Sequence, residues 1–199
     1  MKEKIEALLF STQREGIENL MKHMEEYGFY KAPCSGQHHL AKIGGLAEHS
    51  LNVCEVAFRL TESLHANIPQ ESIIIGALLH DIGKMGQYNK PNYVPNMLKG
   101  RATKADPNPE PYQSLAKPYI TNPELLYLDH EVRSLAIISK FIDLTEEEQQ
   151  AILWHNGLYG NFKYQIQGNE TPLYMILHFA DMWASRVVEK EEGEKEDGI

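Results

Sequence analysis

The segment IIIGALLHD at residues 73–81 decides the fold of this chain. It follows Pro69, a residue that favours the first turn of a helix. The apolar residues leave no polar face, so the sequence predicts a helix over about 70–82 that is buried on all sides. Such a helix lies at the centre of a domain, and this one carries His80 and Asp81 at its buried end.

His80 and Asp81 need partners in such a place. Burying an ionised carboxylate beside an imidazole is costly unless something positive compensates both groups. A divalent metal ion does so, because neutral imidazole nitrogens and carboxylate oxygens are its usual ligands. The alternative is a buried, hydrogen-bonded pair without a metal.

Other polar residues stand in similarly apolar helices. His49 lies on or beside the apolar stripe of a predicted helix over about 46–64, and Asp181 lies within a predicted helix over about 172–190. His130 and His155 belong to two further predicted helices, over about 130–142 and 146–155. A packing or helix-terminal role is the alternative for each of these two histidines.

The phrase HDIGK at residues 80–84, together with His49 and Asp181, resembles the HD superfamily of metal-dependent phosphohydrolases. The resemblance covers about residues 38–187 and implies an all-α, HD-domain-like helical bundle. It also implies that His49, His80, Asp81 and Asp181 hold one metal ion. The stretch HHLAKIGGLAEHS at residues 38–50 is similar to the opening of HD domains in bacterial 3′–5′ exoribonucleases.

The same resemblance gives His130 and His155 a role. In HD members with two metals, histidines from the helices between the HD pair and the last aspartate bind the second ion, and the HD aspartate bridges both. The exoribonuclease-like members have a His-His pair where this chain has His155-Asn156, which weakens the likeness to a nuclease but not the two-metal prediction.

The expected activity is hydrolysis of a phosphomonoester or phosphodiester of a nucleotide-like substrate by a metal-activated hydroxide. Asp81 and Lys84 are the expected catalytic residues, and Lys84 would also bind a phosphate oxygen as a point charge. One or two ions of Mn, Fe, Co, Ni or Zn are expected as cofactors, with Mg possible. The alternatives are a di-iron oxygenase of the HD fold and a non-catalytic module that binds a nucleotide. For Lys84 alone, the alternative is a solvated lysine at a helix end.

Residues 83–128 differ from the rest of the chain. They hold seven of the ten prolines, so no long helix is expected there. The insert, about 85–128, combines basic residues with tyrosines, among them Tyr88, Tyr93 and Tyr112. It could cover an anionic substrate as a lid, with Arg101 as a substrate-binding residue. The alternative is an exposed loop kept in solution by its lysines.

Composition and length limit the remaining possibilities. The chain has 199 residues, 42% of them hydrophobic, and a formal net charge of −9. It is expected to form a single domain, with N-terminal helices at about 1–30, the HD core at 38–187 and a solvated acidic tail at 189–199. An acidic chain is not a general duplex-DNA binder, although a short single-stranded nucleic acid is a possible partner. No apolar stretch suits a membrane span or a signal, so a cytoplasmic location without a membrane partner is expected.

Local signals add further expectations. Capping boxes at Thr12–Glu15 and Thr145–Glu148 predict two helix starts. No segment shows the alternation of a strand. His178 is expected to be a core residue or to support the metal site, while His38 and His39 are expected to be loop residues. The two cysteines, Cys34 and Cys54, have no partner by spacing and are expected to be inert thiols.

Overall fold

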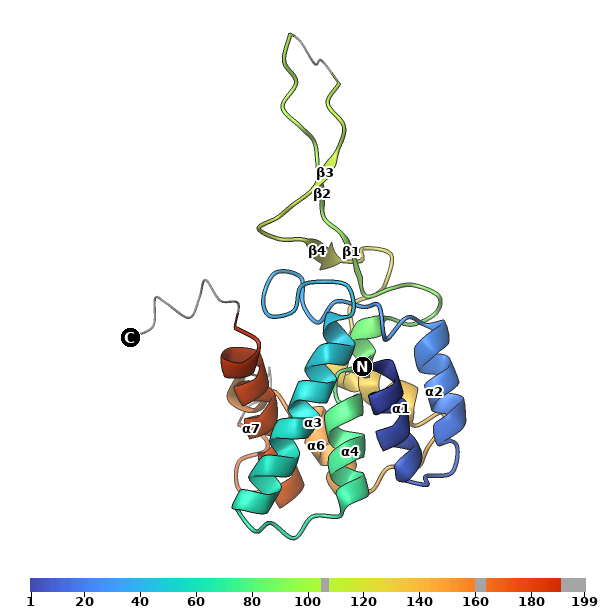
Figure 1. Cartoon of the computed structure of the whole chain (residues 1–199), viewed down its shortest axis with the longest axis vertical. Coiled ribbons are helices and arrows are strands. Elements are labelled where there is room, and N and C mark those ends of the chain that lie inside the picture. Colours follow the sequence, from blue (N-terminus) through green and yellow to red (C-terminus); the bar gives the residue numbers. More distant parts are fainter. Residues whose placement is uncertain (105–107, 160–163, 191–199) are drawn as a thin grey trace, which may run out of the picture.

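The computed structural model describes residues 1–104, 108–159 and 164–190, and it confirms the all-α class (Figure 1). The helices of the described residues are α1 (Lys2–Ser11), α2 (Ile17–Glu26), α3 (Gly45–Ser63), α4 (Gln70–Leu79), α5 (His130–Ile138), α6 (Glu146–Trp154) and α7 (Pro172–Trp183). Two 3₁₀ turns, η1 (Ile82–Met85) and η2 (Gly157–Tyr159), and a π-helix, η3 (Ala184–Val188), complete the helical body.

Helix α4 lies at the centre of this body, as the apolar segment predicts. Every residue from Ser72 to Leu79 is buried. Helices α1, α3, α6 and α7 all contact α4 and cover its sides. Burial on all sides fixes the position of the C-terminal end of α4, where His80 and Asp81 follow.

The two predicted capping boxes have different outcomes. Thr145 caps α6, accepting a hydrogen bond from the Glu148 backbone while the Glu148 side chain accepts one from the Thr145 backbone. The box at Thr12 is wrong, because Thr12 ends α1 and its hydroxyl donates to the Leu9 carbonyl at 2.6 Å. Helix α2 begins after Gly16, whose φ is 86°, and a Cβ there would lie 1.9 Å from the Phe141 carbonyl oxygen. Close packing at Gly16 therefore sets this helix start.

The insert forms short strands that the sequence did not predict. Strands β1 (Tyr93–Pro95) and β4 (Tyr119–Thr121) pair antiparallel, as do β2 (Met97–Leu98) and β3 (Tyr112–Gln113). Segments of two or three residues are too short to show alternation in the sequence. The insert projects from the helical body as a long arm, with β1 and β4 at its base (Figure 1).

The end of the helical body also differs from the prediction. The helix expected over 172–190 is α7 up to Trp183, followed by η3, where the Glu189 amide donates to the Ala184 carbonyl at 3.0 Å. Glu189, assigned to the solvated tail, is 8% exposed and therefore buried, which corrects that expectation. The rest of the predicted acidic tail, 191–199, lies outside the described residues.

Candidate metal centre

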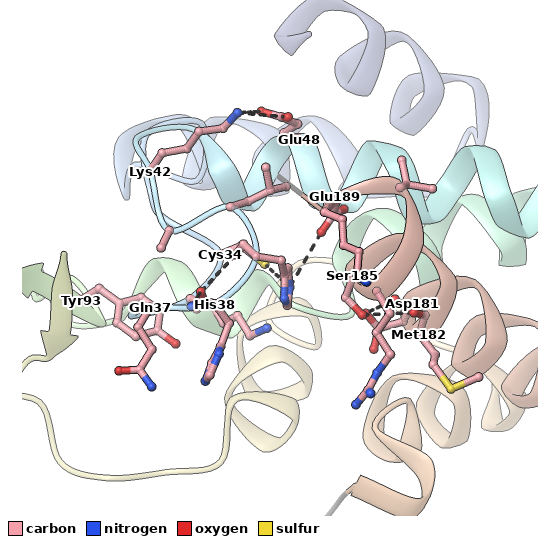
Figure 2. A pocket seen from close by; sticks show the side chains of 18 of the residues that line it. Cys34, Gln37, His38, Lys42, Glu48, Tyr93, Asp181, Met182, Ser185 and Glu189 are labelled. Carbon is pink, nitrogen blue, oxygen red and sulfur yellow. Dashed lines mark hydrogen bonds and ion pairs between the residues drawn. The ribbon is translucent and has the colours of Figure 1, made fainter. Parts of the chain in front are cut away.

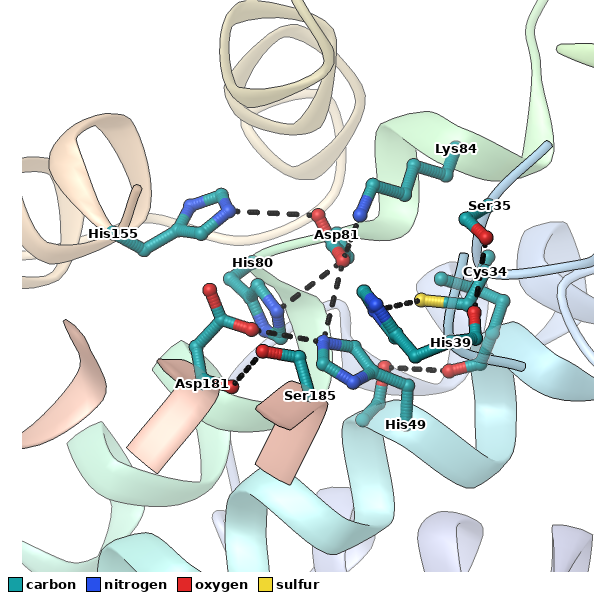
Figure 3. Close-up of polar contacts among 12 residues, drawn as sticks. Cys34, Ser35, His39, His49, His80, Asp81, Lys84, His155, Asp181 and Ser185 are labelled. Carbon is teal, nitrogen blue, oxygen red and sulfur yellow. Dashed lines mark hydrogen bonds and ion pairs between the residues drawn. The ribbon is translucent and has the colours of Figure 1, made fainter. Parts of the chain in front are cut away.

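The six residues that the sequence predicts as metal ligands come from five different helices and meet at one place; Figure 3 labels all of them except His130. His49 lies on α3 and Asp181 on α7. The others stand at helix termini: His80 and Asp81 follow α4, His130 begins α5 and His155 follows α6. The helical packing thus places all six side chains in one cluster.

Asp81 lies at the middle of this cluster, and its two carboxylate oxygens face different histidines. Oδ2 lies 3.6 Å from His49 Nε2 and 3.4 Å from His80 Nε2. Oδ1 lies 3.2 Å from His130 Nε2 and 3.5 Å from His155 Nε2. One fully buried carboxylate is therefore shared by two pairs of imidazoles.

The donor atoms in the cluster fit a cation. Within the described residues, His49 Nε2, His80 Nε2 and Asp81 Oδ1 are buried side-chain atoms without a hydrogen-bond partner. Leaving such groups unsatisfied is costly, and here they point toward one another rather than toward separate partners. Among the described residues, three sets of three are spaced so that each could hold a metal ion: His49, His80 and Asp181; His80, Asp81 and His155; and Cys34, His39 and His49.

The other ring nitrogen of each buried histidine is held by an acceptor. His80 Nδ1 donates to the Ala77 carbonyl at 2.9 Å, and His155 Nδ1 donates to the Ile152 carbonyl at 2.7 Å. A carbonyl oxygen can only accept, so these rings carry a proton on Nδ1 and leave the lone pair of Nε2 free. This is the arrangement that metal-binding histidines require.

His49 obtains the same support from a residue that sequence reasoning missed. Its Nδ1 lies 3.0 and 3.1 Å from the two carboxylate oxygens of Glu189, and Asn52 also donates to Glu189 at 3.0 Å. The acidic composition of 189–199 concealed this role, because it resembles a solvated tail. The apolar residues that precede Glu189 in the predicted helix were the available signal.

Gly83 allows the two halves of the cluster to approach. A Cβ at this position would lie 2.3 Å from the His130 carbonyl oxygen and 2.9 Å from the Ser134 backbone nitrogen. The Gly83 amide donates to the Ser134 hydroxyl at 2.9 Å, which fastens η1 to α5. The glycine of the HDIGK phrase thus lets the start of α5, with His130, pack against Asp81.

Lys84 is joined to the cluster through Asp81. Its Nζ lies 2.6 Å from Asp81 Oδ2, and its side chain is 15% exposed. Burial opposes the charge on this amine, but the Asp81 carboxylate outweighs it and raises the pKa of Lys84. Burial likewise opposes ionisation of Asp81, but Lys84 and the neighbouring histidines hold its pKa well below the usual range. Lys84 therefore keeps a positive charge at the edge of the cluster.

A polar pocket of about 1250 Å³ opens beside the cluster (Figure 2). Lys84, Asp181 and Glu189 line it, as do Tyr93, Leu115 and Pro118 from the base of the insert. Arg101 is exposed in the projecting part of the insert and is not among the described residues that line the pocket. The lid and the role of Arg101 stay predictions.

Three more side chains complete the surroundings. His178 is 8% exposed, and its Nδ1 donates to the His155 carbonyl at 2.8 Å, so it supports the segment that carries His155. Asn156 Nδ2 contacts Glu131 and lies 3.3 Å from His130 Nε2. His39 lies in the loop between α2 and α3, as expected, and its ring packs near His49, with ring centroids 5.0 Å apart.

The helical body and its buried cluster of histidines and aspartates place this chain in the class of candidate metal-binding proteins. Residues 46–182 match the HD domain family, and the chain belongs to that family. Among curated proteins, it is similar to the 3'-5' exoribonuclease YhaM of Geobacillus sp. (strain WCH70), with 28% identity over 104 residues. This match covers 51% of the present chain and 32% of the relative, so the chain spans about a third of that protein's length.

The search of solved structures gave no significant match. In the ranges that the structure describes, no helix combines the length and the apolar character needed to cross a membrane.

Proposed function

We propose that this chain is a metal-dependent phosphohydrolase that cleaves a phosphomonoester or phosphodiester of a nucleotide-like substrate. The observation that carries the proposal is the position of Asp81, whose two oxygens each face a separate pair of imidazole nitrogens. Membership of the HD domain family supports it. The proposal treats residues 1–199 as one HD-type domain and places the protein in the cytoplasm, where free thiols such as Cys34 and Cys54 persist.

Two ions would use the two sides of Asp81. His49, His80, Asp81 and Asp181 would hold one ion, and His130 and His155 would hold the second together with Asp81. Mixed nitrogen and oxygen donors suit Mn, Fe, Co, Ni or Zn, and Mg is a weaker fit. Divalent ions bound there would supply an activated water and neutralise charge on the phosphoryl group.

Lys84 would bind and orient the substrate phosphate. Its amine is charged, lines the pocket and lies at the Oδ2 side of Asp81. Cations held by Asp81 would share its charge, and the Lys84 amine would then be available to a phosphate oxygen, where a positive charge stabilises the transition state. Asp81 and Lys84 are thus the proposed catalytic residues.

The pocket wall offers places for the rest of a nucleotide. The Arg186 guanidinium lies 4.4 Å from the centre of the Tyr159 ring, and both residues line the pocket. An aromatic ring with a neighbouring guanidinium suits a base and its phosphates. The exoribonuclease named above acts on RNA, so short single-stranded RNA belongs among the substrates to be tried.

Metal titration joined to a substrate screen tests the proposal. The full-length protein is loaded with Mn²⁺, which prefers imidazole and carboxylate ligands to thiolates. It is then assayed against nucleoside monophosphates, cyclic dinucleotides, bis-p-nitrophenyl phosphate and short single-stranded RNA. We expect two Mn²⁺ ions per chain and metal-dependent release of phosphate or nucleotide. Absence of turnover with every phosphate ester, or bound iron with uptake of O₂, would contradict the proposal.

The His130→Ala variant separates one ion from two. His130 contacts Asp81 Oδ1 and its side chain is 27% exposed, so its removal should leave the fold intact. We expect the Mn²⁺ content to fall from two ions toward one. The exposed His65 is the matched control, and its alanine variant should keep both ions.

A further inference from the structure

A second group of donor atoms lies on the other side of His49. Cys34 and His39 belong to the loop between α2 and α3, and Glu189 follows η3. The Cys34 thiol lies 3.3 Å from His39 Nε2, and His39 Nε2 lies 3.9 Å from Glu189 Oε2. Cys34, His39 and His49 are spaced so that they could hold a metal ion, and Glu189, from a distant part of the sequence, contacts both His39 and His49.

The His49 ring separates this group from the HD centre. Its Nε2 faces Asp181 at 3.1 Å and Asp81 at 3.6 Å (Figure 3). Its Nδ1 faces Glu189 at 3.0 Å. His49 Nδ1 lies within 3.1 Å of both oxygens of Glu189; Asn52 also donates to Oε1, and Oε2 lies 3.9 Å from His39 Nε2. Glu189 can therefore bind a cation through Oε2 while Oε1 still holds His49.

We propose that Cys34, His39 and Glu189 bind a further metal ion, Zn²⁺ or a similar divalent ion, on the side of His49 that faces away from the HD centre. Sulfur, imidazole and carboxylate are the donors that zinc uses, and three protein ligands leave a fourth position for water. Cys34, His39 and Glu189 all line the pocket, so the fourth position faces solvent and the ion has a path of entry. This site does not depend on the proposed hydrolase activity.

The charges of the donors fit such a site. Cysteine binds zinc as the thiolate, so binding would release the thiol proton of Cys34. The thiolate and the Glu189 carboxylate would then balance the two charges of the ion.

A bound ion would link two segments of the chain that form one wall of the pocket. The ion would join the loop between α2 and α3 to the segment after η3, two parts of the chain that are more than 140 residues apart. It would also hold Glu189 in the position that orients His49.

Cobalt spectroscopy tests the site, because the six donors of the HD centre include no sulfur. Full-length protein loaded with Co²⁺ should show an intense near-ultraviolet band of thiolate-to-cobalt charge transfer. The band should vanish in Cys34→Ser and persist in Cys54→Ser, the matched control, since the chain has only these two cysteines. Absence of the band in the wild-type protein, or its survival in Cys34→Ser, would overturn the proposal.

Two more variants keep the test decisive. His39→Ala changes a half-buried residue and serves if Cys34→Ser fails to fold. Loss of an outer partner of a metal ligand costs about 10–100-fold in affinity, so loss of the direct ligand His39 should weaken Co²⁺ binding at least that much. The double variant His80→Ala, Asp81→Ala should keep the thiolate band. Loss of the band there would mean that Cys34 belongs to the HD centre, and the separate site would be refuted, whereas the hydrolase proposal would stand.

Discussion

The cluster around Asp81 and the insert are built in opposite ways. The cluster draws side chains from five helices, and a second contact holds the rings of His49, His80 and His155 in place. The insert is a projecting arm with two-stranded pairs of two or three residues, and most of its described residues between β2 and β3 are exposed. Of the described part of the insert, the residues that line the pocket are Tyr93, Leu115 and Pro118. We therefore expect the chemistry at the cluster and, for the insert, at most a part in binding.

The largest effect should come from the centre of the cluster. In His80→Ala, Asp81→Ala, metal binding at both sides of the cluster should be lost. Hydrolysis should fall by at least about 1000-fold, a small part of the acceleration that enzymes typically provide. Metal analysis and turnover measure this, and circular dichroism should still show the helices. Turnover that persists in a metal-free double variant would show that hydrolysis does not depend on this cluster.

Gly83→Ala should break the contact between the two halves of the cluster. The added methyl group would meet the His130 carbonyl oxygen at 2.3 Å, and overpacking of this kind costs up to about 3 kcal/mol. We expect a lower free energy of unfolding and a weaker second Mn²⁺ site. Gly76→Ala is the matched control, because a Cβ there lies 3.6 Å from Leu177 in ordinary contact. Equal stability of the two variants would show that η1 and α5 can move apart freely.

Glu189→Ala should weaken the HD centre without removing a ligand from it. His49 would lose the carboxylate that fixes its ring, and such a loss typically lowers metal affinity by about 10–100-fold. Competition with a chelator measures the Mn²⁺ affinity. Lys190→Ala, which changes an exposed neighbour, is the control. Wild-type affinity in Glu189→Ala would mean that His49 needs no support from this residue.

Arg101→Ala, in the arm, should have the smallest effect. If the insert covers an anionic substrate, KM should rise by at most about fivefold, because an exposed charge is worth about 1 kcal/mol or less. The value of kcat should not change. Arg59→Ala, at an exposed position of α3, is the control. An unchanged KM would contradict the lid hypothesis and would increase the difference in role between the insert and the cluster around Asp81.

Sequence reasoning predicted the helical class, the central position of α4 and the residues that gather around Asp81. This prediction succeeded because an apolar helix is buried, and because His80 and Asp81 at its buried end need polar partners. The roles of those partners as metal ligands remain to be tested.

The remaining errors have physical causes. Thr12 carries the pattern of a helix start, but close packing of Gly16 against Phe141 places the start elsewhere. The strands of the insert are too short to leave a periodic signal. Glu189 becomes a neighbour of His39 and His49 only through tertiary packing, so neither its spacing nor its local composition marks it.

The π-helical turn η3 sets the direction in which Glu189 points. A π-turn contains one more residue than an α-turn, and Ala184–Val188 form such a turn just before Glu189. If the same residues wound as a regular α-helix, the extra residue would advance Glu189 by about 100° around the helix axis. The carboxylate would then turn away from His49, so the wide turn itself keeps Glu189 beside the cluster.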